Sequence, residues 1–305
     1  MNLFQRGKAA LNLIVCSGFV FCFCTCDNTP DPAPVKSDDF ETSPESFPVT
    51  PGIIDEASGI APGRSMKGYL WTLQDSGQPH SLYLLSGNAT TIKEYDLPGT
   101  NNHDWEDIAT GPGPETGINY IYVADIGNNN APLTSSNIIY RIPEINQEGE
   151  FFSQNKLEKI TFTYPDGPRD AEALLLDPVT KDLFVISKET SSTGIYRLPF
   201  PQSTTNVIQA EKVGVVPSML LVTAGDVSPS GDEILIRTYL MVYHWRKKSG
   251  ESIGQTLTRA ADKQFLVAAE PQGEGICFDA DAKGFFTLSE KANAASVKLN
   301  YYKRK

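Results

Sequence analysis

The sequence predicts an all-β fold, a β-propeller in which four-stranded antiparallel sheets are repeated around a central channel. The same phrase recurs along the chain at intervals of roughly 50 to 65 residues, at or above the upper end of the range for propeller blades. Each copy contains a strand that is apolar at consecutive positions, which indicates a sheet buried on both faces. No amphipathic helix of useful length is visible. A sandwich or a two-domain arrangement would not explain a repeat that runs through the whole domain.

The N-terminal segment predicts export. Residues 1–8 carry basic side chains and no acid, and residues 9–23 are almost wholly apolar, which is the layout of a secretory signal peptide. The residues around Cys26 resemble a bacterial lipoprotein signal, although Phe23 and Thr25 depart from the residues that are common at their positions. We expect residues 1–25 to be removed and Cys26 to be acylated. Plain secretion and a retained anchor helix are the alternatives.

The segment that follows predicts a tether. Residues 26–39 are rich in proline and aspartate, and such a segment buries too little apolar surface to offset the entropy of ordering it. We expect it to hold a single propeller domain, residues 40–305, away from a membrane. The domain would then face the periplasm or the cell surface.

The repeat can be followed strand by strand. Each unit opens with an acidic or small residue and an apolar run, and the openers begin at Ser58, Glu106, Glu172, Gly225 and Glu274. Turn residues follow each opener. A strongly apolar second strand comes next, at 69–73, 120–124, 183–186, 233–236 and 285–288. A third strand carries an apolar–tyrosine pair, at 82–83, 139–140, 195–196, 242–243 and, weakly, 300–301. A more polar fourth strand follows, as at 159–163 and 264–267.

The number of blades follows from these units. The last unit runs out after its third strand, so we expect a strand from within residues 40–54 to supply the missing outer strand and close the ring. That arrangement predicts five blades. Six is the alternative, if the long second unit hides a degenerate blade.

Charge and cysteine content exclude some classes of function. The 305 residues carry a formal net charge of −11, so phosphate backbones are repelled and nucleic acid is not an expected partner. Cations and basic ligands fit better. Four of the five cysteines lie at or before Cys26, so no disulfide can form within the domain. The remaining Cys277 lies in an apolar run, which is typical of a small buried hydrophobe rather than a nucleophile.

Propeller topology predicts where a site would lie. The start of the innermost strand and the end of the second strand meet on one face of the ring. That face would gather acids from the starts, at Glu56, Glu106, Glu172, Asp226 and Glu274. It would also gather charges from the ends, at Asp75, Asp125, Lys188, Glu189, Arg237, Glu290 and Lys291. Such charges around a narrow channel create a strong local field. The alternative is that the repeated acids are blade-building devices that accept backbone N–H bonds.

Residues that break the symmetry are better functional candidates. His103 and Asp104 could act as acid or base beside Trp105, which could contact a ligand; a plain surface loop is the alternative. The loop of residues 125–130 offers Asp125 and Asn128 as hard oxygen ligands for Ca²⁺, although it is also a good turn.

A cationic group is the other candidate feature of this face. Arg169, Lys188 and Arg237 could form a clamp for a phosphate or carboxylate, or could pair internally with the repeated acids. No nucleophile elbow, zinc-protease motif, phosphate-binding loop or dinucleotide fingerprint is present in the predicted domain.

Two pairs of stretches carry a family resemblance. Residues 172–178 with 182–189, and 272–276 with 285–290, resemble bacterial extracytoplasmic propellers of the phytase-like and SdiA-regulated kind. These motifs belong to the strands that build a blade, so the resemblance implies the fold and an extracytoplasmic location more than it implies an activity. Propeller phytases and gluconolactonase-type enzymes bind Ca²⁺ on the channel face. Similarity to them implies that Glu106, Asp125, Glu172 and Glu274 are calcium ligands.

Two functions therefore stay open. The first is a lipid-anchored binding or scaffold module whose acidic pocket takes a small molecule, a glycan or a protein. The second is a Ca²⁺-dependent hydrolase of phosphoesters or lactones, with His103 or Asp104 accepting the proton.

Overall fold

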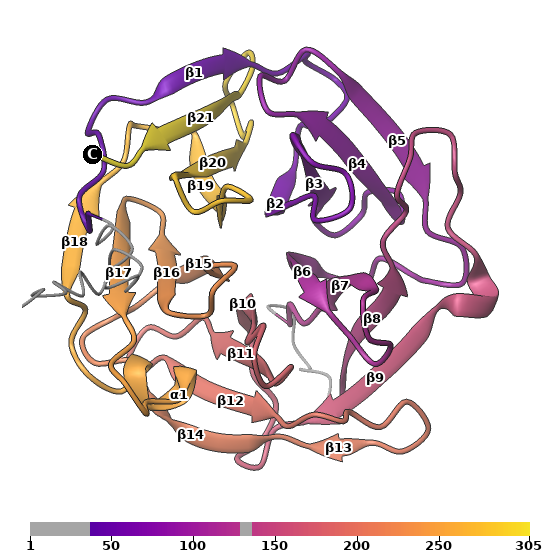
Figure 1. The fold of residues 1–305 in the computed structure, drawn as a ribbon, viewed down its shortest axis with the longest axis vertical. Coiled ribbons are helices and arrows are strands. Elements are labelled where there is room, and N and C mark those ends of the chain that lie inside the picture. The colour runs from indigo at the N-terminus through magenta and orange to yellow at the C-terminus, as the bar shows by residue number, and fades with distance from the viewer. Residues whose placement is uncertain (1–36, 129–135) are drawn as a thin grey trace, which may run out of the picture. The chain divides into compact units, whose positions relative to one another are not determined.

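The computed structural model describes residues 37–128 and 136–305, and five sheets carry the fold (Figure 1). Each sheet forms one blade, and the innermost strands of neighbouring blades pack against one another around the channel (Figure 1). The predicted five-bladed propeller is confirmed. Cys26, residues 1–25 and most of the tether lie outside the described residues, so the signal, the acylation and the domain boundaries stay predictions.

The blades follow the chain in order. Blade 1 consists of β2 (Ala57–Pro62), β3 (Tyr69–Gln74), β4 (Ser81–Ser86) and β5 (Ile92–Asp96). Blade 2 consists of β6 (Trp105–Pro112), β7 (Asn119–Asp125), β8 (Asn137–Pro143) and β9 (Glu158–Thr163), with the short β13 (Ile208–Gln209) parallel to β9. Blade 3 consists of β10 (Ala171–Leu176), β11 (Leu183–Ser187), β12 (Gly194–Leu198) and β14 (Glu211–Val215). Blade 4 consists of β15 (Val222–Val227), β16 (Glu233–Thr238), β17 (Met241–Arg246) and β18 (Lys263–Leu266). Blade 5 consists of β19 (Gln272–Phe278), β20 (Gly284–Glu290), β21 (Lys298–Lys303) and β1 (Glu45–Pro48).

The hydrophobic core lies between the blades. Five clusters of buried side chains are present in the described residues, and each joins one pair of neighbouring blades. Because each blade packs against a neighbour on either side, both faces of its sheet are buried. This explains why the second strands are apolar at consecutive positions instead of alternating. Helices contribute little: α1 (Ile253–Leu257) and the 3₁₀ helix η1 (Gln154–Lys156) are the helices of the described chain, and neither could cross a membrane.

The ring is closed as predicted. β1 pairs antiparallel with β21, from Glu45 opposite Tyr301 to Pro48 opposite Lys298. A bridge between Phe40 and Arg304 extends the contact. The Phe40 ring is buried, and its centroid lies 5.0 Å from that of Phe285. The N-terminal segment of the domain therefore supplies both the missing strand and part of the core between blades 4 and 5.

Every innermost strand contains a β-bulge near its start. The residues that the bulges insert are Glu106, Glu172, Thr223 and Glu274, with Ser58 and Gly59 at the bulge of blade 1. A bulge redirects a side chain out of the pleat, so each of these positions can face the channel. The sequence alignment of the fourth repeat was wrong here. It placed Asp226 beside the repeated glutamates, whereas the register of β15 puts Thr223 there.

Candidate functional site

The bulges bring acidic side chains together at one mouth of the channel. Five carboxylates, Asp75, Asp104, Glu106, Asp170 and Glu172, form two groups of three. In each group the ligand oxygens lie within 4.8 Å of one another, and Glu106 belongs to both groups. The starts of β6 and β10 and the end of β3 supply these residues. The predicted meeting of strand starts and strand ends is thus present in the structure.

Glu106 lies at the centre of this cluster. Its side chain is 5% exposed, and no amide, hydroxyl or basic group of the described residues donates a hydrogen bond to it. Its neighbours are other acids, so burial and the charge of Glu172 raise the pKa of Glu106 well above its usual range. A buried carboxylate without a donor is costly unless it is protonated or meets a cation.

The pKa values of Asp104, Glu172 and Glu274 are shifted in the same direction. Burial raises the pKa of Asp104 to about 6, with a further contribution from the charge of Asp75. Burial also raises the pKa of Glu172 to about 7, although Lys188 opposes the shift. On blade 5, burial and the charge of Glu172 raise the pKa of Glu274 to about 9. The mouth therefore retains protons near neutral pH as long as no cation neutralises it.

One lysine contacts the cluster directly. Lys188 follows β11, and its Nζ donates to Glu172 Oε1 at 2.6 Å. The same Nζ lies 5.4 Å from the centroid of the Tyr239 ring, on blade 4. Burial alone would lower the pKa of Lys188, but its pairing with Glu172 raises that pKa overall. Lys188 is thus a charged ammonium on the side of the mouth where blades 3 and 4 meet.

Blade 5 adds a bridged pair of acids. Gln272 Nε2 donates to Glu274 Oε1 at 3.2 Å and to Glu290 Oε2 at 2.6 Å. Burial raises the pKa of Glu290 to about 7, and the charges of Asp75 and Glu56 add to this shift. The amide of Gln272 holds the two carboxyl groups in place without neutralising them.

The loop after β7 positions the acids of blade 2. Asp125 accepts a hydrogen bond from the backbone N–H of Asp104 at 2.9 Å, and the backbone N–H of Asn128 donates to Asp170 at 2.8 Å. Gly127 packs against the cluster, where a Cβ atom would lie 2.1 Å from Glu106 Oε1. Only glycine leaves room for the carboxylates at this position. Asp125 and Asn128 therefore border the cluster and organise it.

The remaining predicted residues are not brought together at the mouth. His103 is exposed on its loop, whereas Trp105 is fully buried in the core between blades 1 and 2. Arg169 pairs with Asp166 and Glu189. Arg237 is fully buried, pairs with Glu270 and donates to the carbonyl oxygen of Gly275 at 2.9 Å. Both arginines pair internally, but with Asp166, Glu189 and Glu270 and not with the repeated acids; of the three predicted cations, Lys188 is the one that pairs with a repeated acid, Glu172.

Asp107 links three neighbouring blades next to the cluster. Its carboxylate accepts backbone hydrogen bonds from Ile108 at 2.8 Å, Leu174 at 2.9 Å and Gly225 at 3.3 Å. These donors belong to the innermost strands of blades 2, 3 and 4. Hydrogen bonding to backbone N–H groups, which was expected of the repeated acids, is therefore observed. Asp107 accepts such bonds and its neighbour Glu106 does not, while Asp226 accepts one from the backbone N–H of Phe278 at 2.8 Å.

Three residues that line the mouth were not predicted as site residues from the sequence. They are Asp170, which was considered only as part of a cationic segment, and Gln272 and Tyr239. A signal for two of them was present: an acidic or amide residue stands two positions before the bulge glutamate in blades 2, 3 and 5. Asp104, Asp170 and Gln272 occupy that position.

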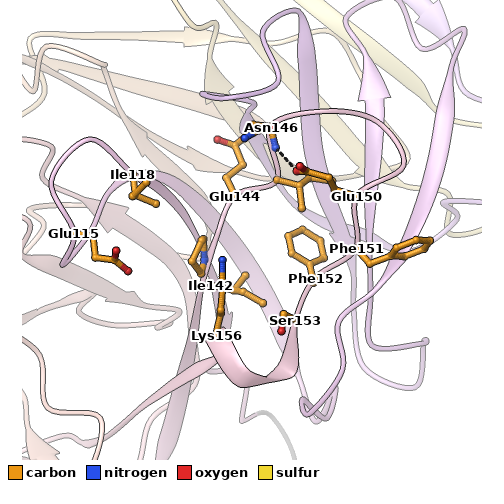
Figure 2. A pocket seen from close by; sticks show the side chains of 12 residues that line it. Glu115, Ile118, Ile142, Glu144, Asn146, Glu150, Phe151, Phe152, Ser153 and Lys156 are labelled. Carbon is orange, nitrogen blue, oxygen red and sulfur yellow. Dashed lines mark hydrogen bonds between the residues drawn. The ribbon is translucent and has the colours of Figure 1, made fainter.

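A second hollow lies on the opposite face of the propeller. This cavity of about 420 Å³ is formed where β8 ends, opposite the start of β7, and Figure 2 shows the side chains that line it. Its acids are partnered by the protein itself. Glu144 accepts hydrogen bonds from the backbone of Arg64 and Ser65 and from Trp71 Nε1, and Glu150 accepts one from Asn146. The channel mouth, where Glu106 receives no hydrogen bond from an amide, hydroxyl or basic group of the described residues, is the stronger candidate site.

Comparison with known proteins supports the fold. No family model matches the chain, and no curated protein matches it. Among solved structures, that of a luciferin-regenerating enzyme shares 7% identity, covers 86% of this chain and 95% of that chain, and superposes with a TM-score of 0.51. The Dos1 propeller shares 11% identity over 81% of this chain and 68% of that chain, with a TM-score of 0.36. At 7% identity, the likeness to the first of these structures concerns the β-propeller fold alone.

Proposed function

We propose that this protein is a propeller binding module whose channel mouth binds a divalent cation, best Ca²⁺, and through it a small ligand. The single observation that supports this most is the buried, donor-free Glu106 at the junction of two carboxylate groups. The fold permits such a site but does not specify it, since one fold supports many functions.

The donor set fits a hard cation. The cluster of Asp75, Asp104, Glu106, Asp170 and Glu172 offers carboxylate oxygens and neither thiolate nor imidazole, which suits Ca²⁺ or Mg²⁺ better than Zn²⁺. The raised pKa values of Asp104, Glu106, Asp170 and Glu172 agree with this, because a bound cation would stabilise the ionised forms that burial disfavours. Asp125 and Asn128 would hold Asp104 and Asp170 in place through their hydrogen bonds, and Glu274 would border the set.

The location of the protein at a membrane is the second part of the proposal. We propose that Cys26 carries the lipid that anchors the protein and that residues 27–39 span the distance between membrane and propeller. The apolar run before Cys26 and the acidic, proline-rich composition after it support this arrangement. The mouth would then meet ligands of the periplasm or the cell surface.

A Ca²⁺-dependent hydrolase is the second candidate, and one observation favours it. Asp104 lies in the cluster with a pKa of about 6, close to the value that suits a general base at neutral pH. A bound cation would supply Lewis acidity toward a phosphoester or lactone. Asp104 would accept the proton, whereas the exposed His103 could act only at the rim.

The binding proposal is tested by titrating the purified full-length protein with Ca²⁺ in a calorimeter. We expect saturable binding, and Glu106→Gln should weaken it at least tenfold, because even the loss of an outer-shell partner costs about 10–100-fold in metal affinity. Glu211→Gln is the matched control, since it removes one negative charge from an exposed strand far from the mouth. Equal Ca²⁺ affinities for wild type and Glu106→Gln would refute the assignment. Turnover of a lactone or phosphoester that is lost in Asp104→Asn would favour the hydrolase.

A further inference from the structure

An exposed apolar patch adjoins the channel mouth on blade 4. Leu220 and Leu221 lie in the loop before β15, and Leu240 lies in the turn between β16 and β17; their side chains are 43%, 41% and 67% exposed. The start of an innermost strand and the end of a second strand lie on the same face, and Val222 pairs with Thr238 in this blade. The three leucines therefore lie on the mouth face.

On the mouth face, the described residues of blade 4 place no acid at the start of β15 or at the end of β16. Blade 4 has Leu221 and Thr223 near the positions where blades 2 and 3 carry acidic pairs. The backbone N–H of Leu221 donates to the carbonyl oxygen of Glu189 at 3.1 Å, which ties the patch to the turn that carries Lys188. Tyr239, whose ring faces Lys188 Nζ, directly precedes Leu240. Apolar surface and a cation thus lie side by side.

The backbone of Leu221 adopts a conformation that leucine rarely takes. Leu221 has a φ of 55°, in the left-handed region that glycine or asparagine normally occupies. Ser218, in the same loop, has a φ of 54°. Strained backbone clusters at active and ligand-binding sites, which supports a functional role for this loop.

We propose that this patch, together with Lys188, binds an amphiphilic anion: a carboxylate or phosphate whose alkyl chain lies over Leu221 and Leu240. The ammonium of Lys188 would pair with the anionic group, and a cation at Glu106 would add to its attraction. The cation part of this inference rests on the proposed function, whereas the apolar part does not.

The test is calorimetry of the full-length protein with butanoate, hexanoate and octanoate, and with octyl phosphate as the phosphate counterpart, at saturating Ca²⁺. Each methylene that leaves water contributes about 0.8 kcal/mol, so we expect the Kd to fall by up to about fourfold for each added methylene. Octyl glucoside, which has the chain but no charge, should bind at least tenfold more weakly than octanoate.

Two variants separate ligand contact from folding. Leu221→Gly removes the side chain and also relieves the left-handed backbone, so the variant should be at least as stable as wild type and yet lose most of the chain-length dependence. Lys188→Met should weaken octanoate binding while keeping that dependence. Leu266→Ser is the matched control, because Leu266 is 66% exposed but lies on the outer strand β18; its affinities should equal those of wild type.

The outcomes are distinguishable from those of the cation test. Octanoate binding that persists in EDTA and depends on Leu221 would support the patch even if Ca²⁺ does not bind. Ca²⁺ binding with no chain-length dependence, or with equal loss in Leu266→Ser, would overturn the patch and leave the cation site standing. Binding of octyl phosphate but not octanoate would assign the anion as phosphate.

Discussion

In the absence of divalent cations, the protein should have a lower free energy of unfolding at pH 8 than at pH 5. A carboxyl group whose pKa rises on folding stabilises the folded state while it is protonated. That stability is fully present below the unfolded pKa and is lost as the pH rises through the folded pKa. For Glu172 and Glu290 the loss occurs between an ordinary pKa of 4.5 and a folded pKa of about 7. For Glu274 it extends to about 9.

The magnitude can be worked out for Glu172, whose residue is 2% exposed. Between pH 5 and 7 the folded state retains a proton that the unfolded state has lost. Each pH unit corresponds to about 1.4 kcal/mol, so Glu172 alone accounts for about 2–3 kcal/mol. For a chain of this size that is about 5–10 °C in Tm. Acids with lowered pKa values, such as Asp166, have finished ionising below this window and do not oppose the trend.

The assay is thermal unfolding in EDTA at pH 5, 6, 7 and 8, repeated with excess Ca²⁺. We expect Tm to fall with rising pH in EDTA, and Ca²⁺ at about 100 times its Kd to restore about 2.7 kcal/mol at pH 8. Glu172→Gln should flatten the EDTA profile, whereas Glu211→Gln should not. A metal-free protein whose stability is constant or rises between pH 5 and 8 would refute the reasoning, because the mouth would then hold its charges without cost.

Three further predictions concern the parts that hold the mouth in place. Asp107→Ala leaves buried backbone N–H groups of several blades without an acceptor, at a cost of about 1–3 kcal/mol for each group. Urea unfolding should therefore show that the free energy of unfolding falls by more than about 2 kcal/mol. An unchanged urea midpoint would argue against a role of Asp107 in holding the blades together. Phe40→Ala should cost about 3–5 kcal/mol, since the ring fills the core beside the closure, and proteolysis should cut the N-terminal segment first; resistance equal to that of wild type would contradict this. Gly127→Ala places a methyl group against Glu106, so Ca²⁺ affinity should fall by more than tenfold while Tm changes little, and the reverse pattern would show that Gly127 serves folding alone.

The architecture could be predicted because it depends on short-range patterns. Strands that are apolar at consecutive positions require burial on both faces, and their repetition along the chain requires a repeated sheet. The pairing of β1 with β21 was predictable for the same reason, because a repeat that lacks its outer strand leaves an edge that the chain must cover.

The membership of the mouth was only partly predictable. Glu106, Glu172 and Glu274 were recognised from the repeat, since a regular fold places equivalent residues at equivalent points, and Asp104 was recognised because its loop departs from the repeat. The roles of Arg237 and Trp105 were not recognised, because burial and partner choice depend on neighbouring blades that are distant in sequence.

The sequence by itself determined the fold class, the blade number and the face on which charge would gather, because continuous apolar runs, turns and repeats can be read along the chain. Only the tertiary structure decided which acid lies next to other carboxylates and which accepts hydrogen bonds from backbone N–H groups. Glu106 and Asp107 are adjacent and similar in chemistry, yet a one-residue bulge turns the first toward other carboxylates and leaves the second among backbone N–H groups of three blades. That difference arises from register across strands, which no local pattern encodes.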